Sequence, residues 1–343
     1  MSVFGPHAKP WRRYGVTIQP PGERRVAQAD VRKAGIAQDR FVLRQGMNHR
    51  PRCLPSCPAA ASLWIMRLGS AARAIALVAV SVCGTGAVPS VADRARAFDG
   101  TVALQDGRRI ALRCSGRGSF TVLLEPGDGG RRAHMARLFA ALSQRYRVCD
   151  YDRRNIGLSS SAPLPRKAAD LSADLFDALS ATRIDGPYIL FGSSMGGLLV
   201  RSYAATHPIA GFVTSNQPGT SREWVRRAHP VMTASERSAD MAWMAGDNIE
   251  HIDVNDVSRT IDKARAPSIP HIIMISTERF QCPAAGTCGP TYRAFVSISR
   301  QAASAGTHGR FRVLDGDHDL YVTHLPAVVK AIDAVAAAAS ARR

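Results

Sequence analysis

Residues 188–197 combine an apolar segment, a glycine-flanked serine and the start of a helix-like segment, a pattern that can activate a hydroxyl group. Ser194 lies at the centre of the sequence Gly-Ser-Ser-Met-Gly. A sharp strand-to-helix turn exposes the hydroxyl of its central serine. The N-terminus of the following helix adds N–H donors where an oxyanion would develop. We therefore predict that Ser194 is a nucleophile and that Gly192 and Gly196 keep its turn free of collisions; the alternative is a simple Gly/Ser loop.

A histidine near the C-terminus occupies the position where this chemistry needs a general base. Residues 311–315 are typical of a last strand, residues 325–339 are Ala-rich and helix-like, and His318 lies between them. Such a histidine would accept the Ser194 proton and later return it to the leaving group. The alternative interpretation is a solvated loop histidine among acidic neighbours.

The carboxylate that would complete a Ser-His-acid triad is less sharply defined. The chain order serine, acid, histidine favours Glu278, which follows the apolar segment 271–276. Glu278 would orient the imidazole of His318 and stabilise its charged form. The position after the preceding apolar segment, 211–215, holds Asn216, which cannot stabilise an imidazolium as a carboxylate does. Three aspartates lie close to His318 in sequence and could take this role instead of Glu278: Asp315, Asp317 and Asp319.

Four blocks of sequence occur in a set order, at residues 112–127, 147–159, 192–196 and 316–318. On these blocks, residues 98–340 resemble the α/β-hydrolase fold, and most closely its secreted serine-hydrolase branch with a Cys-x-Gly segment before the oxyanion loop. The resemblance implies a mostly parallel central sheet flanked by helices, without a metal or an organic cofactor. It also implies an oxyanion hole made by the backbone N–H groups of Met195 and Asp128, although Pro126-Gly127 replaces the common His-Gly pair.

The spacing of apolar residues favours the same α/β architecture. Segments 101–105 and 108–114, joined by an Asp-Gly turn, predict a hairpin. Further strands are expected at 121–124, 147–151, 188–191, 211–215, 271–276 and 311–315. Helices are expected around 134–144 and at 170–181, 198–205 and 325–339. Strands that alternate with helices favour a parallel sheet covered on both faces.

Residues 218–267 change to a polar, helix-prone pattern, for which we predict a small helical cap over the site. This segment holds five large apolar side chains: Trp224, Met232, Met241, Trp243 and Met244. They could line an apolar substrate pocket or only pack the cap against the body.

The formal net charge of +18 is unevenly distributed along the chain. Residues 1–97 hold 15 Lys and Arg against 4 Asp and Glu, whereas residues 98–343 hold 30 against 23. Basic and acidic residues are interspersed in the second part, without an aromatic platform, which argues against nucleic acid as a partner. We expect a small-molecule ester or acyl substrate and leave the oligomeric state open.

The first 97 residues are typical of processing segments. A basic start at Met66, a short apolar stretch at 74–83 and small residues beyond it make residues 66–92 a predicted secretory signal peptide. The stretch is shorter than the about twenty residues of a membrane-spanning helix. Residues 1–65 predict a disordered basic extension or a start assigned upstream of Met66. We expect a secreted, periplasmic or cell-envelope protein without a stable membrane span, with a lipid anchor at Cys83 as an alternative.

Four cysteines follow the predicted signal peptide: Cys114, Cys149, Cys282 and Cys288. An even number suits an oxidising compartment. In the fold implied by the resemblance, the strands near Cys114 and Cys149 are neighbours, so a disulfide between them is feasible. Cys282 and Cys288 enclose a short loop that a second bond would stiffen. The alternative is four buried or free thiols.

These observations predict an exported serine hydrolase that cleaves ester or related acyl bonds through an acyl-enzyme. Ser194 is the expected nucleophile, His318 the base and Glu278 the residue that orients the base. The same triad serves peptidases and cofactor-free haloperoxidase-like enzymes. A catalytically silent binding protein of the same fold is the alternative from another class.

Overall fold

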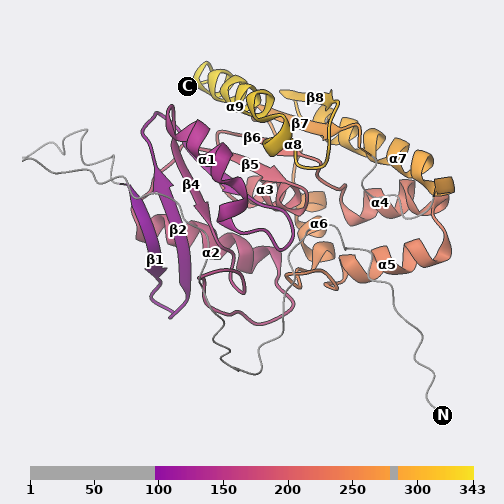
Figure 1. Cartoon of the computed structure of the whole chain (residues 1–343), viewed down its shortest axis with the longest axis horizontal. Coiled ribbons are helices and arrows are strands. Elements are labelled where there is room, and N and C mark those ends of the chain that lie inside the picture. The colour runs from indigo at the N-terminus through magenta and orange to yellow at the C-terminus, as the bar shows by residue number, and fades with distance from the viewer. Residues whose placement is uncertain (1–96, 279–284) are drawn as a thin grey trace, which may run out of the picture. The chain divides into compact units, whose positions relative to one another are not determined.

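An eight-stranded sheet forms the centre of the molecule (Figure 1). The computed structural model describes residues 97–278 and 285–343. The strands lie across the sheet in the order β1-β2-β4-β3-β5-β6-β7-β8, and only the β1–β2 and β2–β4 pairs are antiparallel. Their bounds are β1 Phe98–Ala103, β2 Arg109–Ser115, β3 Thr121–Glu125, β4 Arg147–Tyr151, β5 Tyr188–Ser193, β6 Gly211–Ser215, β7 His271–Ser276 and β8 Gly309–Leu314. The predicted mostly parallel sheet is confirmed.

Burial explains why the central strands are so apolar. Every residue of β3 and β7 is buried, as expected of parallel strands that are covered on both faces. The edge strand β1 instead has exposed residues at alternate positions. It turns into β2 through Asp106 and Gly107, where Gly107 has a φ of 81° that glycine adopts without strain. The predicted hairpin is therefore present.

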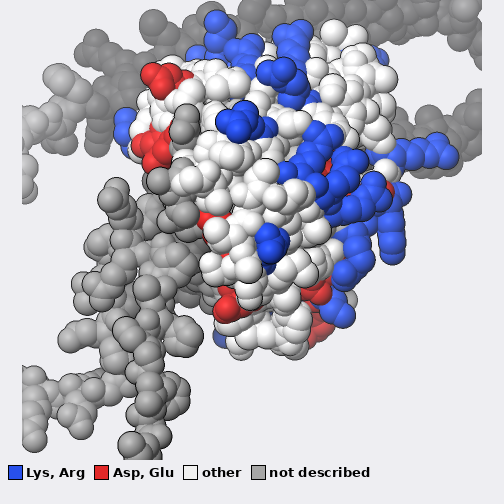
Figure 2. All heavy atoms as spheres, turned by 90° about the vertical axis from the view of Figure 1, so that its right-hand side faces the viewer, with Lys and Arg blue, Asp and Glu red and all other residues white. Residues whose placement is uncertain are grey.

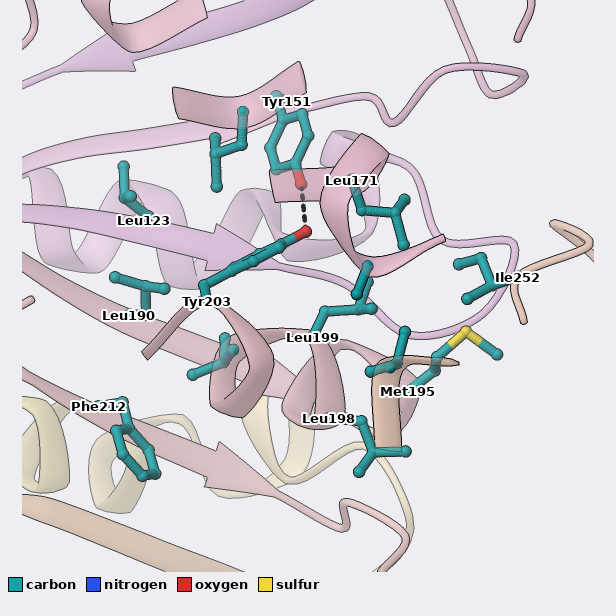
Figure 3. Close-up of a cluster of buried hydrophobic side chains, with 14 of the residues drawn as sticks. Leu123, Tyr151, Leu171, Leu190, Met195, Leu198, Leu199, Tyr203, Phe212 and Ile252 are labelled. Carbon is teal, nitrogen blue, oxygen red and sulfur yellow. Dashed lines mark hydrogen bonds between the residues drawn. The ribbon is translucent and has the colours of Figure 1, made fainter. Parts of the chain in front are cut away.

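Two hydrophobic cores lie on opposite faces of the sheet because strand side chains alternate. On β3, Leu123 belongs to one core, whereas Val122 and Leu124 belong to the other. Figure 3 shows part of the first core, in which the hydroxyls of Tyr151 and Tyr203 lie 3.2 Å apart. These cores hold the strands rigidly and so fix the positions of the loops at their ends.

Helices supply the outer sides of both cores (Figure 1). The first core includes residues of α2 (Ala168–Ala181) and α3 (Met195–Thr206), and the second includes residues of α1 (Ala136–Ser143) and α9 (Leu325–Ser340). The short helix α8 (Leu320–Thr323) directly precedes α9. Among the described residues, no helix combines the length and the apolar character needed to cross a membrane.

The segment between β6 and β7, where the sequence predicted a cap, is helical. It contains α4 (Ser221–Arg227), a 3₁₀ turn (His229–Val231), α5 (Ala234–Met244) and α6 (Val254–Lys263). Of its large apolar side chains, Trp224 and Met244 are buried in the first core, and Met232 and Trp243 pack against that core. Met241 is 49% exposed. Most of these side chains therefore attach the segment to the body.

Outside the predicted cap segment, two described helices were not predicted: the four-residue α8 and the much longer α7. Residues 285–304 form α7 (Ala285–Ser304), so the expectation that Cys282 and Cys288 enclose a loop was wrong at its C-terminal end. Two glycines and Pro290 near the start of this helix argue for a loop on local propensity. Tertiary packing overrides that propensity, because Phe295 and Ile298 are buried in the first core.

Several sequence predictions concern residues outside the described ranges. They are the basic extension at 1–65, the signal peptide at 66–92, the alternative anchor at Cys83 and the pairing of Cys282. Each of these stays a prediction.

The first predicted disulfide is present. Cys114 of β2 and Cys149 of β4 are bonded, and they are direct partners in the register of the two antiparallel strands. Both side chains are buried. The bond therefore ties the antiparallel edge of the sheet to its parallel part.

We expect the variant Cys114→Ala/Cys149→Ala to lose about 2–4 kcal/mol of unfolding free energy, because the bond restricts the unfolded chain. Urea unfolding of the purified chain measures this loss. A reductant should destabilise the wild type more than the variant, since only the wild type has this bond to lose. Equal sensitivity of both proteins would contradict the assignment.

Candidate active site

Ser194 lies where β5 passes directly into α3. Its φ is 54° and its ψ is −126°, a conformation that costs a non-glycine residue on the order of 1–3 kcal/mol. Two backbone bonds hold it: its N–H donates to Ser215 O of β6 at 2.8 Å, and Gly197 N–H donates to Ser194 O at 2.9 Å. The chain thus changes direction at this serine without an intervening loop.

The two flanking glycines are required by close backbone contacts. A Cβ on Gly192 would lie 2.4 Å from the carbonyl oxygen of Gly196. A Cβ on Gly196 would lie 2.3 Å from the carbonyl oxygen of Glu125, at the end of β3. Real Cβ atoms do not approach backbone oxygens so closely. The turn therefore depends on glycine at both positions, for the reason expected from the sequence.

The loop after β3 packs against the serine. A Cβ on Gly127 would lie 3.2 Å from Ser194 Cβ and 3.8 Å from Ser194 Oγ, so this loop backbone borders the hydroxyl group. Gly130 N–H donates to Gly127 O at 3.0 Å and closes a turn that contains Asp128. Met195, which begins α3, is buried. The two expected oxyanion donors, Met195 and Asp128, thus belong to the two segments that meet at Ser194.

His318 is tied to the same edge of the sheet by Asn216. Asn216 Nδ2 donates to His318 O at 2.7 Å, and Asn216 Oδ1 accepts from Ser276 N–H at 2.8 Å. Since Ser215, the residue before Asn216, holds the Ser194 backbone, the end of β6 connects the serine turn with the histidine loop. Asn216 is therefore a positioning side chain, a role that its sequence position alone did not indicate.

Glu278 also contacts the histidine loop. Its Oε2 accepts a hydrogen bond of 2.6 Å from the backbone N–H of His318. Two of the aspartates near His318 have different contacts: Asp315 Oδ1 accepts from Thr277 Oγ1 at 2.7 Å, and Asp317 Oδ1 accepts from Thr323 Oγ1 at 2.9 Å. The structure thus brings Glu278 to His318 through the backbone of the histidine.

The surroundings of His318 favour its neutral form. Burial lowers the pKa of His318 below its usual 6.5, and negative charge on Asp319, Glu278 and Asp317 offsets part of this effect. A neutral imidazole can accept a proton at neutral pH. Nearby acids would then stabilise the imidazolium that forms.

Three buried charged residues at the loop after β3 were not predicted from sequence. Arg153 is paired with Glu125 and with Glu250, and each of these side chains is at most 3% exposed. Burial raises the pKa of Glu125, although Arg153 and Tyr151 act in the opposite direction. Arg153 and Glu125 lie in blocks that carried the family resemblance, but nothing in the sequence linked Glu250 to them.

A shallow groove between α4 and α7 is lined by several arginine side chains. Its lining includes Arg227, Arg293 and Arg300 but no carboxylate, and Figure 2 shows Lys and Arg side chains gathered on one face of the molecule. The sequence suggested a simple mixture of charges. Residues seven apart on a helix share a face, which brings Arg293 and Arg300 together.

Within the described ranges, no cluster of three or more His, Cys, Asp or Glu is suited to a metal ion.

Residues 121–243 match the model of a protein family described as alpha/beta hydrolase fold. The match runs from β3 to α5 and includes both the serine turn and the loop that packs on it. The described part of the chain has the α/β-hydrolase fold. The fold implied by the sequence resemblance is thus confirmed.

Two solved enzyme structures align with more than two thirds of this chain. An enol-lactonase from Burkholderia xenovorans LB400 is 21% identical with a TM-score of 0.48, and the alignment covers 69% of this chain and 99% of that one. A thermophilic esterase from Thermogutta terrifontis is 17% identical with a TM-score of 0.48, over 70% and 97% of the two chains. Similarity at this level says nothing of the substrate.

One curated protein shares a shorter stretch of sequence. A probable transporter from Hormonema carpetanum, efuK, is 30% identical over 105 residues. The match covers 29% of this chain and 15% of that protein. This chain therefore spans a small part of that protein's length.

We expect Gly192→Ala to lower the free energy of unfolding by about 3 kcal/mol or more, because the new Cβ meets backbone that cannot move independently. Thermal unfolding and soluble yield measure the effect. Gly286→Ala is the matched control, since a Cβ there meets nothing within 4 Å, and it should leave the stability unchanged or raise it by up to about 1 kcal/mol, because Ala favours the helix α7 more than Gly does. Equal stability of the two variants would refute the close packing at the turn.

Proposed function

We propose that the protein is a serine hydrolase that cleaves a carboxylic ester or a related acyl bond. The observation that carries the proposal is the backbone of Ser194, held at a φ of 54° between β5 and α3 with the loop of Gly127 against its side chain. Strained backbone of this kind persists where the surrounding structure enforces it, often at functional sites. A structural serine would need neither the strain nor the adjacent glycines.

The proposed reaction begins with attack of Ser194 Oγ on the substrate carbonyl carbon while His318 accepts the hydroxyl proton. The N–H groups of Met195 and Asp128 stabilise the oxyanion of the tetrahedral intermediate. His318 returns the proton to the leaving group, which departs and leaves an acyl-enzyme. Water, activated by His318, then attacks the acyl carbon and regenerates Ser194.

Glu278 is the proposed acid of the triad. Its contact with the His318 backbone N–H and its charge near the imidazole support this role. Burial of the imidazole makes a fixed negative charge more effective than it would be in water. Asp319 remains the alternative, because its charge also favours the imidazolium.

The proposal includes export and a small-molecule substrate. The disulfide between Cys114 and Cys149 supports an oxidising compartment, where such bonds persist. The helical segment 218–267 is the proposed cap of the substrate site, because its loop residues Ile249 and Glu250 contact Asp128.

We expect a fluorophosphonate to label the wild type and Ser193→Ala but not Ser194→Ala, because only Ser194 is proposed to be activated. Ser193 is the matched control, since it is the adjacent serine and is buried in β5. Intact-mass spectrometry measures the adduct. A folded wild type that forms no adduct would remove the basis of the proposal and favour a silent binding protein.

We expect the rate of ester hydrolysis to fall at acidic pH with an apparent pKa below 6.5, because His318 must be neutral to accept a proton and its pKa is lowered by burial. A profile of kcat/KM from about pH 4 to 8 measures this limb. Glu278→Gln should move the limb to lower pH, since the negative charge of Glu278 raises the pKa of His318. An acid limb above pH 6.5 would contradict the assignment of His318 as the base.

A further inference from the structure

Arg153, Glu125 and Glu250 form a cluster of buried charged side chains beside the loop after β3. Arg153 is 1% exposed, and its partners Glu125 and Glu250 are 3% and 2% exposed. Tyr151 adds a hydrogen bond of 2.8 Å to Glu125 Oε2, and Figure 3 shows its ring in the first core. Buried ion pairs are poor sources of stability, because desolvation opposes their attraction. A role in fixing the backbone of the adjacent loop explains these buried ion pairs better than a contribution to stability.

The guanidinium of Arg153 makes five hydrogen bonds to the groups around it. A guanidinium has five N–H donors. Nε donates to Glu250 Oε2 at 2.7 Å, Nη1 donates to Pro126 O at 3.0 Å and to Glu125, and Nη2 donates to Gly127 O at 2.7 Å and to Glu250. Two of the five acceptors are backbone carbonyls of the loop that borders Ser194.

The bond to Gly127 O sets the direction of the next N–H group. The Gly127–Asp128 peptide is trans, since the cis bonds of the described chain precede Pro165 and Pro187. In a trans peptide the C=O and N–H groups point in opposite directions. Arg153 holds the C=O on its own side, so the Asp128 N–H is turned away from Arg153.

The helical segment between β6 and β7 holds the same loop through Glu250. Glu250 Oε1 accepts from Gly129 N–H at 2.7 Å. In return, the carboxylate of Asp128 accepts from Ile249 N–H at 3.0 Å and from Glu250 N–H at 3.2 Å. The loop is therefore fixed from two sides, by Arg153 in the segment after β4 and by the predicted cap.

We propose that Arg153 and Glu250 are positioning residues that orient the Asp128 N–H of the oxyanion hole, and that the predicted cap thereby contributes to transition-state stabilisation. This inference rests on the proposed serine-hydrolase function. The contacts of both side chains that the structure describes lie within this cluster and the loop after β3, so their proposed effect is indirect. Their removal should weaken stabilisation of the oxyanion, which forms only during reaction, while ground-state binding of the substrate is retained.

The test compares two carboxylate-to-amide changes at buried carboxylates that each pair with an arginine. Glu250→Gln keeps the size of the side chain but loses its charge and one acceptor for Arg153. Asp150→Asn is the matched control, because Asp150 is 1% exposed and pairs with Arg113 between β2 and β4. Both variants are assayed with a soluble aryl ester, and thermal unfolding checks that each is folded at the assay temperature.

We expect Glu250→Gln to lower kcat by about 10- to 100-fold with KM within about threefold of wild type. Asp150→Asn should keep kcat within about twofold, even if both variants melt at a lower temperature. A merely structural role of Glu250 would give two variants with the same kcat. That result, with an active wild type, would overturn the inference and leave the proposed function intact.

Two further outcomes are distinguishable. A wild type that neither hydrolyses esters nor reacts with a fluorophosphonate would overturn the proposed function, and the inference with it.

If Glu250→Gln does not fold, Asp128→Asn tests the same connection from the loop side, because it weakens the bonds to Ile249 and Glu250 but keeps the backbone N–H. An unchanged kcat in Asp128→Asn would overturn the inference; a lower kcat at constant KM would support it.

Discussion

The backbone conformation of Ser194 is the constraint on which the rest of the site depends. A serine keeps a φ of 54° only because the packing and hydrogen bonds of the surrounding structure enforce this backbone conformation. The strand before it is paired on both sides, since β5 lies between β3 and β6. The helix after it starts at once, and glycines at 192 and 196 remove the collisions that this closeness would cause.

The remaining parts of the site attach to this turn through strand ends. Parallel strands place their C-terminal ends at one edge, so the loops after β3, β5, β6, β7 and β8 become neighbours. Asn216, after β6, bridges the backbone of β7 and the loop of His318. Glu278, just beyond β7, contacts the same loop. The arrangement is thus a consequence of strand order combined with a few polar side chains at the strand ends.

Much of the fold could be predicted because its signals are local. Apolar segments marked the buried central strands, an Asp-Gly turn marked the β1–β2 hairpin, and the Gly-Ser-Ser-Met-Gly sequence marked the turn at Ser194. Helix α7 was missed because its stability comes from the burial of Phe295 and Ile298, which local propensity opposes. The cluster of Arg153, Glu125 and Glu250 was missed because Glu250 lies 97 positions beyond Arg153 along the chain, and Glu125 lies 28 positions before Arg153. Such partners are set by tertiary structure alone.

A crystal structure of the phosphonate adduct would test the central claim most directly, because the adduct imitates the tetrahedral intermediate. The account predicts a covalent bond from Ser194 Oγ to phosphorus, with the phosphoryl oxygen about 2.7–3.1 Å from the N–H nitrogens of both Met195 and Asp128. An adduct on another residue, or a phosphoryl oxygen directed away from both N–H groups, would contradict it.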